Sequence, residues 1–285
     1  MLSKVLVTGA NGQLGSQLKE ICGTDPNYLF TDINELNILD RNQVSRLFNS
    51  QKIDFVINCA VYTAVDKAES EPELAEAVNA TAVKNLVDGC KINDSKIIHI
   101  STDFVFNGMK SSPYTETDIE NPLSIYGKSK LNGEMHLRNS YDKYIILRSS
   151  WLYSKFGNNF VKTIIRLAKE KEEIGVVFDQ IGTPTYAGDL AIFIKYLVDS
   201  NFSQFGVYNY SNEGTASWYD FARSILEYSN LNLKIRPIET NEYLTPARRP
   251  SYSVLNKSKT KATFGVEIAY WRTSLQRLIS KMIGM

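Results

Sequence analysis

The sequence predicts an α/β protein built on a doubly wound parallel sheet, with a smaller lobe toward its C-terminal end. Short β-branched apolar runs alternate with longer helical patterns through the first half, which is typical of βαβ units. Beyond residue 180 the elements shorten, and they are interrupted at Gly182, Pro184, Pro237, Pro246 and Pro250. We therefore expect a first domain over 1–180 and a second lobe formed mainly by 181–285.

The strands of the first domain are expected to be buried on both faces. Their apolar residues are continuous instead of alternating with polar ones, as in parallel sheets covered by helices on both sides. The six runs are 5–8, 28–31, 55–59, 97–101, 144–147 and 176–178.

Helices are expected between these strands, because apolar residues recur there at spacings of three and four. Pro72 begins one of them and fits the preference for proline in a first turn. The segments are 14–22, 43–49, 72–90, 126–139 and 160–171.

The second lobe has fewer clear elements. We expect a helix over 187–199 that returns to the first domain, a strand over 206–210 and a helix over 218–228. A last helix over 271–283 is amphipathic and predicts core packing.

Composition excludes several classes of protein. Lys and Arg total 32 against 31 Asp and Glu, so no strong field attracts nucleic acid or an anionic membrane. No apolar run reaches the ~18 residues of a membrane span, and the N-terminal residues lack a secretory apolar region, which predicts a cytoplasmic protein. Three cysteines without Cys-x-x-Cys spacing and only two histidines give no disulfide framework and no metal site.

A glycine turn follows the first predicted strand. Gly9 permits a sharp turn, Gly12 lets backbone approach a pyrophosphate, and Gly15 allows a helix to pack closely on the sheet. The helix N-terminus then offers unpaired N–H groups to the pyrophosphate. This arrangement predicts a Rossmann-like dinucleotide site, whose loop also contains Asn11, Gln13 and Leu14.

Residues after the second and third strands are expected to complete this site, because ligands collect at the carboxyl ends of parallel strands. Asp32 could accept hydrogen bonds from the ribose hydroxyls of the adenosine, which favours NADH. Arg41 could instead accommodate the 2′-phosphate of NADPH. The alternative role for Asp32 is to cap a helix or a turn. Asp40 is either a helix N-cap or an adenine contact. The loop after the third strand either lines the coenzyme or is an ordinary strand exit, at Ala60, Val61, Tyr62 and Thr63.

Tyr126 and Lys130 are the candidate reaction centre. Four residues apart on a helix, they share one face, so the ammonium can sit beside the phenol and lower the Tyr126 pKa from its ordinary value near ~10. Thr102 could donate a second hydrogen bond to the same substrate oxygen. The spacing alone occurs by chance on many helices, but its position after a dinucleotide turn favours catalysis.

These segments together resemble the extended short-chain dehydrogenase/reductase superfamily and, more closely, the dTDP-4-dehydrorhamnose reductase family. The matching segments are TGANGQLG at 8–15, YTAVDKAE at 62–69, STDFVF at 101–106, SSWLY at 149–153, DQIGTPT at 179–185, and RP at 249–250 with SVL at 253–255. They run in order across nearly the whole chain.

The resemblance implies NADPH- or NADH-dependent reduction of the C4 ketone of a dTDP-4-keto-6-deoxy sugar, giving dTDP-rhamnose. Tyr126 would give the proton, Thr102 would hold the oxygen, and Lys130 would bind the nicotinamide ribose and hold the Tyr126 pKa down. Asp103 and Trp151 match substrate positions, the indole packing on a sugar or thymine face; a turn-forming aspartate and a core tryptophan are the alternatives. Arg249, after Arg248, offers a planar fork for a diphosphate.

Departures from the family pattern bear on the alternatives. A related 4,6-dehydratase needs a carboxylate base where this chain has Phe104, so elimination is excluded. A 4-epimerase or another nucleotide-sugar 4-reductase shares the catalytic set, and a non-catalytic coenzyme-binding regulatory subunit shares the fold. Some relatives dimerise through magnesium held by a carboxylate on the first helix, where this chain has Gln17, so we expect a monomer or homodimer without such a metal.

Overall fold

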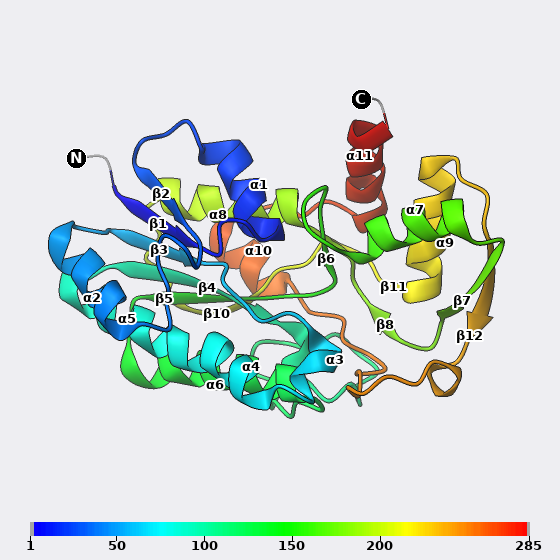
Figure 1. The fold of residues 1–285 in the computed structure, drawn as a ribbon, viewed down its shortest axis with the longest axis horizontal. Coiled ribbons are helices and arrows are strands. Elements are labelled where there is room, and N and C mark those ends of the chain that lie inside the picture. The colour runs from blue at the N-terminus through cyan, green and yellow to red at the C-terminus, as the bar shows by residue number, and fades with distance from the viewer. Residues whose placement is uncertain (1–2, 284–285) are drawn as a thin grey trace.

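The structure, a computed structural model, describes residues 3–283. It has a larger lobe built on a six-stranded parallel sheet and a smaller lobe of helices and short strands beside it (Figure 1). The predicted fold class is confirmed. The sheet contains β1 (Val5–Thr8), β2 (Tyr28–Thr31), β3 (Phe55–Asn58), β4 (Lys96–Thr102), β5 (Tyr144–Ser149) and β10 (Gly206–Asn209).

The sheet order is β10-β5-β4-β3-β1-β2, so the chain reverses its direction of progress between β1 and β3. At such a switch point the loops after the two strands diverge to opposite faces and leave a crevice at their carboxyl ends. The glycine turn follows β1 and residues 59–63 follow β3. The topology therefore brings these two predicted segments to one crevice.

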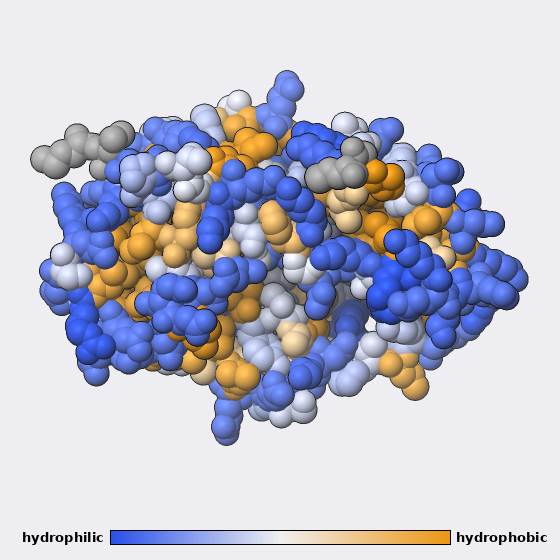
Figure 2. All heavy atoms as spheres, turned by 45° about the horizontal axis from the view of Figure 1, so that its top comes forward, coloured by the Kyte–Doolittle hydropathy of each residue, from blue (hydrophilic) through white to orange (hydrophobic). Residues whose placement is uncertain are grey.

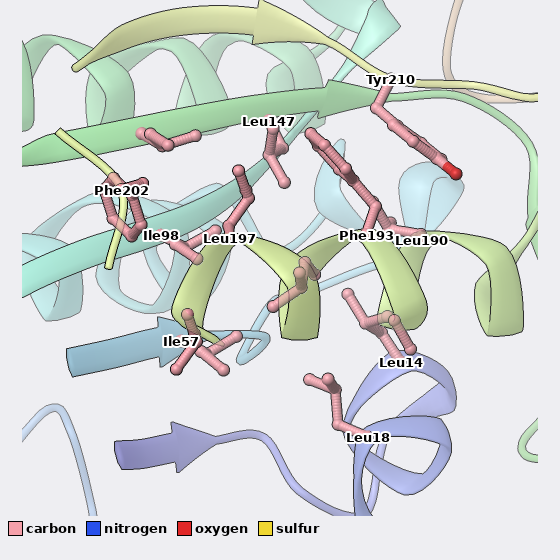
Figure 3. Close-up of a cluster of buried hydrophobic side chains, with 14 of the residues drawn as sticks. Leu14, Leu18, Ile57, Ile98, Leu147, Leu190, Phe193, Leu197, Phe202 and Tyr210 are labelled. Carbon is pink, nitrogen blue, oxygen red and sulfur yellow. The ribbon is translucent and has the colours of Figure 1, made fainter. Parts of the chain in front are cut away.

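Helices cover both faces of the sheet. On one face lie α1 (Gln13–Cys22), α8 (Ala187–Asp199) and α10 (Ser258–Phe264); on the other lie α2 (Arg41–Ser50), α5 (Ala82–Asn93) and α6 (Ile125–Ser140). Val5 and Val7 enter the first core while Leu6 enters the second, as the strand period of two requires. Figure 3 shows α8 side chains pointing toward the sheet, with Leu14 and Leu18 of α1 beside them.

The expected single helix over 72–90 is interrupted. The structure has α3 (Val65–Ala68), α4 (Pro72–Glu76), a π-helical turn η1 (Ala77–Thr81) and then α5. The wide turn carries the buried Asn79 against α6, where a methyl group added at Gly133 would lie 2.2 Å from the Asn79 carbonyl oxygen. Such turns often mark functional sites in helices.

The smaller lobe has its own core, built from the apolar faces of three helices. Its elements are β6 (Leu152–Tyr153), α7 (Phe160–Glu170), β7 (Glu173–Val177), β8 (Ile181–Gly182), β9 (Thr185–Tyr186), β11 (Ala216–Ser217), α9 (Trp218–Ser229), β12 (Lys234–Ile238), η3 (Thr240–Glu242) and α11 (Trp271–Ile283).

The division of the chain differs from the expected boundary at residue 180. The run 176–178 was expected in the main sheet, but β7 pairs with β12, and Val161, Ile164 and Val176 pack in the core of the smaller lobe. Residues 160–177 thus belong with the second lobe by packing. Residues 187–199 form α8 and pack in the first core, so the chain crosses between the lobes repeatedly.

No helix within residues 3–283 is long and apolar enough to cross a membrane. Figure 2 shows one face of the molecule, where hydrophilic side chains are interspersed with small hydrophobic areas around a hollow near the middle.

Candidate active site

A groove of about 670 Å³ lies at the carboxyl ends of β1, β3 and β4, within the size range of small-molecule sites. The predicted coenzyme residues that line it are Gly9, Asn11, Gly12, Gln13, Leu14, Asp32, Ala60, Val61 and Thr63. Its walls also include residues that the sequence did not single out, such as Leu36, Leu39, Val78 and Ile100.

The glycines have the geometry that a bound pyrophosphate requires. Gly9 has φ +66°, and a methyl group there would lie 2.6 Å from the Ala60 Cα. A methyl group at Gly15 would lie 2.2 Å from the Gly9 carbonyl oxygen, so α1 packs closely on the turn. Gly12 is the N-cap of α1 and offers no side-chain acceptor to the first N–H groups of the helix. The turn and helix N-terminus therefore fit an anionic dinucleotide.

Asp32 lies at the rim of this groove and fixes the glycine loop. Its Oδ2 accepts a hydrogen bond from the Asn11 N–H at 2.8 Å, and its Oδ1 accepts one from Ile33 at 2.8 Å. Arg41, the candidate partner for a 2′-phosphate, forms an ion pair with Asp88 at 3.1 Å. The Asp32 carboxylate at the rim of the groove is therefore not paired with Arg41.

Several predicted coenzyme residues are placed outside the groove lining. Asp40 caps α2 by accepting from the N–H groups of Asn42 and Gln43, which is the cap alternative. Gly15 packs behind the turn. Tyr62 donates its hydroxyl to Glu71 at 2.5 Å, while its backbone N–H donates to Asn79 at 2.9 Å.

Thr102 and Tyr126 meet beside the end of β4. Thr102 is the last residue of β4 and caps the short helix η2 (Asp103–Val105) by accepting from the Phe104 N–H at 3.2 Å. Tyr126 lies in the first turn of α6, which Ser124 caps, and its hydroxyl lies near enough to the Thr102 side chain for Thr102 to act on the Tyr126 pKa. Phe104 packs edge-on against the Tyr126 ring with centroids 5.8 Å apart. Two hydroxyls therefore converge at one point.

The electrostatics of Tyr126 differ from the expectation. Burial raises the pKa of Tyr126 to about 12; the hydrogen bond with Thr102 opposes this rise and the Asp103 charge adds to it. Lys130 is not among the groups that lower the pKa of Tyr126, and its Nζ donates to the Ile100 carbonyl at 2.7 Å. The expected lowering is wrong for this arrangement, and Tyr126 keeps its proton at neutral pH.

A buried chain of hydrogen bonds leads from β1 through the sheet to Lys130. Asn58 Oδ1 accepts from Thr8 Oγ1 at 2.7 Å and from the Ala60 N–H at 3.2 Å, which fixes the orientation of the amide. Asn58 Nδ2 therefore donates to His99 Nδ1 at 3.0 Å, so neutral His99 carries its proton on Nε2. That nitrogen lies 3.5 Å from Lys130 Nζ.

The two titratable groups of this chain, His99 and Lys130, are both favoured in their neutral forms. Burial lowers the pKa of His99 well below its ordinary range, with the Lys130 charge acting in the same direction. Burial lowers the pKa of Lys130 to about 8, while Glu134 and Cys59 oppose it. His99 Nε2–H can donate only to an uncharged amine, which is the form of Lys130 that burial also favours.

A buried ion-pair network lies one turn further along α6, and the sequence reasoning missed it. Arg148 of β5 contacts Glu134 through Nε to Oε1 at 3.0 Å and through Nη2 to Oε2 at 2.7 Å. Ser101 donates to Glu134 at 2.5 Å. Glu120 pairs with both Arg148 and Arg138. The network fixes α6 against β4 and β5, the elements that carry the reacting groups.

Asp103 is the predicted substrate residue with the most unusual environment. It is 2% exposed, and burial raises its pKa to about 7, while hydrogen bonds from Ser253 and Thr102 oppose the rise. Its Oδ2 has no hydrogen-bond partner anywhere in residues 3–283. A buried carboxylate oxygen without a partner is costly and is suited to a hydroxyl from a ligand.

Arg249 is engaged within the protein. Its two terminal nitrogens contact Asp66 at 3.0 and 2.7 Å, and Nη1 also donates to Thr245 at 2.5 Å. The pair joins the C-terminal lobe to α3 instead of leaving the fork open for a diphosphate. Arg248 is exposed, and among the described residues no acidic group forms an ion pair with it.

The matching family model, described as the RmlD substrate binding domain, spans residues 3–283. A dTDP-4-dehydrorhamnose reductase of Aggregatibacter actinomycetemcomitans is 40% identical over 97% of this chain and 98% of its own length. The chain belongs to the dTDP-4-dehydrorhamnose reductase family. The family resemblance predicted from the sequence is confirmed.

Solved structures of the family have the same fold as this chain. The dTDP-4-dehydrorhamnose reductase of Bacillus anthracis, in complex with NADP, has a TM-score of 0.94 and 39% identity, covering 99% of this chain and 100% of that one. The Clostridium acetobutylicum enzyme has a TM-score of 0.94 and 41% identity with the same coverage. A Thermus thermophilus UDP-glucose 4-epimerase in complex with NAD, at 19% identity, a TM-score of 0.83 and 99% coverage of both chains, shares the fold alone.

The position on α1 where some relatives are expected to carry a metal-binding carboxylate is occupied by Gln17. Gln17, at the expected ligand position, is buried and donates to Glu20 at 2.8 Å. Residues 3–283 contain no group of three or more His, Cys, Asp or Glu side chains placed to hold a metal ion.

Proposed function

We propose that this protein reduces the C4 ketone of dTDP-4-dehydro-6-deoxy-L-mannose to dTDP-L-rhamnose with NADPH or NADH. The observation that carries the proposal is the convergence of the Thr102 and Tyr126 hydroxyls beside a dinucleotide groove, in a chain of this reductase family. Two hydroxyl donors at one point suit a carbonyl oxygen that gains negative charge during reduction.

The groove residues would hold the coenzyme. Gly12 and the first N–H groups of α1 would receive the pyrophosphate, Asp32 would accept from the adenosine ribose, and Ala60 to Thr63 would form the wall. Bound there, the reduced nicotinamide supplies the hydride. Lys130, one helical turn from Tyr126, would bind the nicotinamide ribose.

Tyr126 would be the general acid. Because burial raises its pKa to about 12, the phenol is protonated at neutral pH and can give its proton to the developing alkoxide. Thr102 would donate a hydrogen bond to the same oxygen as its charge grows. Lys130, with a pKa of about 8, is placed to return a proton to the site afterwards.

Substrate contacts are proposed on the side of the smaller lobe. Asp103 would accept a sugar hydroxyl through its unpartnered Oδ2. Trp151 follows β5 two residues after Ser149, which pairs with Thr102, so it lies beside the same point. Arg249 would reach a diphosphate only by exchanging Asp66 for it. We further expect a cytoplasmic monomer or homodimer that does not bind nucleic acid, consistent with the balanced charge.

The test is spectrophotometric. Purified protein should oxidise NADPH or NADH only when the dTDP-4-keto-6-deoxy sugar is present, and Tyr126→Phe should lose about 10²- to 10⁴-fold in kcat, the usual contribution of a general acid. Tyr270→Phe, which removes a hydroxyl from an exposed ring, is the matched control and should keep the wild-type rate. Coenzyme binding without sugar-dependent oxidation would refute the proposal and favour the regulatory-subunit alternative.

A further inference from the structure

Trp151 has an unusual backbone for a large side chain. Its φ is +46°, in the left-handed region that such residues rarely adopt. The peptide is held there by β9, because the Thr185 N–H donates to the Trp151 carbonyl at 3.1 Å. Residues kept in strained backbone conformations cluster at ligand sites, where the surrounding structure fixes them. The backbone therefore aims this indole in one direction beside the reaction centre.

One face of the Trp151 indole is covered by Trp218. The two rings are nearly parallel, at 7°, with centroids 3.6 Å apart. Trp218 is the first residue of α9, whose start is fixed by a capping box between Ser217 and Asp220. Phe160 packs on Trp218 at 4.7 Å between centroids. Trp218 is thus itself held in place and presents a flat, rigid wall.

The opposite face of the indole is covered by Gly182. A methyl group at Gly182 would lie 2.5 Å from Cε2, 2.7 Å from Cζ2 and 2.7 Å from Nε1 of Trp151. Because these three bonded atoms lie at such similar distances, Gly182 must approach the face of the Trp151 ring and not its edge. Trp218 already fills the space against one face, so Gly182 lies against the other. Gly182 pairs with Ala216, two residues before Trp218, so one short ladder supplies both walls.

This enclosure changes what Trp151 can do. With Trp218 on one face and Gly182 against Cε2, Cζ2 and Nε1 on the other, the indole has little open face for the stacking on a sugar or thymine ring that the sequence suggested, and its edge is left to meet a ligand. The same ladder also reaches Asp103. Ile181, next to Gly182, accepts a hydrogen bond from the Ser253 N–H at 2.8 Å, and the Ser253 side chain lies near enough to Asp103 to oppose the rise of its pKa.

We infer that Trp218 is a positioning residue for the reduction, which acts through Trp151 by holding the edge of that indole toward the nucleotide sugar. The inference rests on the proposed function. Trp218 lies behind Trp151 and is absent from the coenzyme groove. Its loss should therefore weaken the response to the sugar and leave the response to the coenzyme unchanged.

The experiment compares Trp218→Leu with Trp218→Phe. The leucine variant should raise the KM for the dTDP-4-keto-6-deoxy sugar roughly tenfold, the upper end of an aromatic pair's contribution, while the KM for coenzyme stays within about twofold. The phenylalanine variant keeps an aromatic wall and should recover most of the wild-type KM. Stacked indoles give paired bands of opposite sign in far-ultraviolet circular dichroism, and both variants should lose them.

Two outcomes separate this inference from the proposed function. If wild type turns over the sugar, and Trp218→Leu loses the paired bands yet keeps the wild-type sugar KM, the inference is overturned and the function stands. If wild type shows no turnover, the proposed function fails, and the inference is judged by calorimetry with dTDP-glucose, which lacks the C4 ketone. Weaker binding by Trp218→Leu, restored in Trp218→Phe, then supports it, and equal or absent binding overturns it.

Discussion

Arg148→Met should show whether the buried ion-pair network contributes more to stability than an exposed surface ion pair does. The side chains of Arg148 and Glu134 are both 0% exposed and meet through two parallel contacts. Methionine keeps most of the length of arginine but removes its charge and donors. Glu134 would then be a buried carboxylate supported only by Arg138 and Ser101.

The expected cost follows from this burial. Removing one partner of a buried pair usually costs about 3–5 kcal/mol, because the other charge is left uncompensated. Since Glu134 keeps two partners, we expect the lower end, about 3 kcal/mol. At about 2 °C per kcal/mol for a chain of this size, the melting temperature should fall by roughly 6 °C. Activity should fall as well, because the network fixes α6 beneath Tyr126.

The assay is thermal and urea unfolding of three variants. Arg166→Met breaks an exposed pair with Glu170 and should cost no more than about 0.5 kcal/mol. Adding Glu134→Gln to Arg148→Met removes the stranded charge and should recover part of the loss. A single variant within about 1 kcal/mol of wild type, or a double variant less stable than the single one, would refute the electrostatic reasoning.

Two further predictions concern carboxylates of the site. The folded protein holds the Asp103 proton more tightly than the unfolded chain, so its stability should be lost as pH rises from about 4 through about 7. Asp103→Asn should match the stability of wild type at pH 4. At pH 8 its free energy of unfolding should exceed that of wild type by up to about 4 kcal/mol, for a shift of about three pH units. Equal pH dependence of the two proteins in urea unfolding would contradict this. Asp32→Ala removes a negative charge at the groove rim and should raise the kcat/KM ratio of NADPH over NADH about tenfold, whereas Glu35→Gln, outside the groove lining, should not. A ratio unchanged in Asp32→Ala would exclude Asp32 as a selectivity residue.

The parts of the fold that follow from local chemistry could be predicted from the sequence. Continuous apolar runs identified five of the six strands of the main sheet, and the Gly9 turn fixed where the groove begins; β10 was expected in the second lobe instead. The run 176–178 was misplaced because a short apolar strand looks the same in either lobe; its partner, β12, lies some sixty residues later. The π-helical turn at Asn79 was missed because its helical periodicity is nearly unbroken.

The site residues that were misjudged depend on contacts distant in sequence. Arg249 is paired with Asp66, 183 residues away, and no local sequence pattern predicts that pair. Stacking between Trp151 and Trp218 likewise joins two residues that lie far apart in the sequence. The spacing of Tyr126 and Lys130 correctly predicted that both lie on one face of a helix. The Lys130 amine, however, donates to the backbone carbonyl of Ile100, and the position of a backbone group cannot be inferred from the sequence.

The repeated crossing of the chain between its lobes has a consequence for how such a protein can be altered. After β5 the chain builds part of the smaller lobe, returns for α8 and β10, leaves for α9, and returns again for α10. A fragment that stopped at residue 180 would lack α8 and would expose the apolar face against which Leu190 and Ile194 pack. The larger and the smaller lobe therefore cannot be exchanged as two continuous segments of the chain.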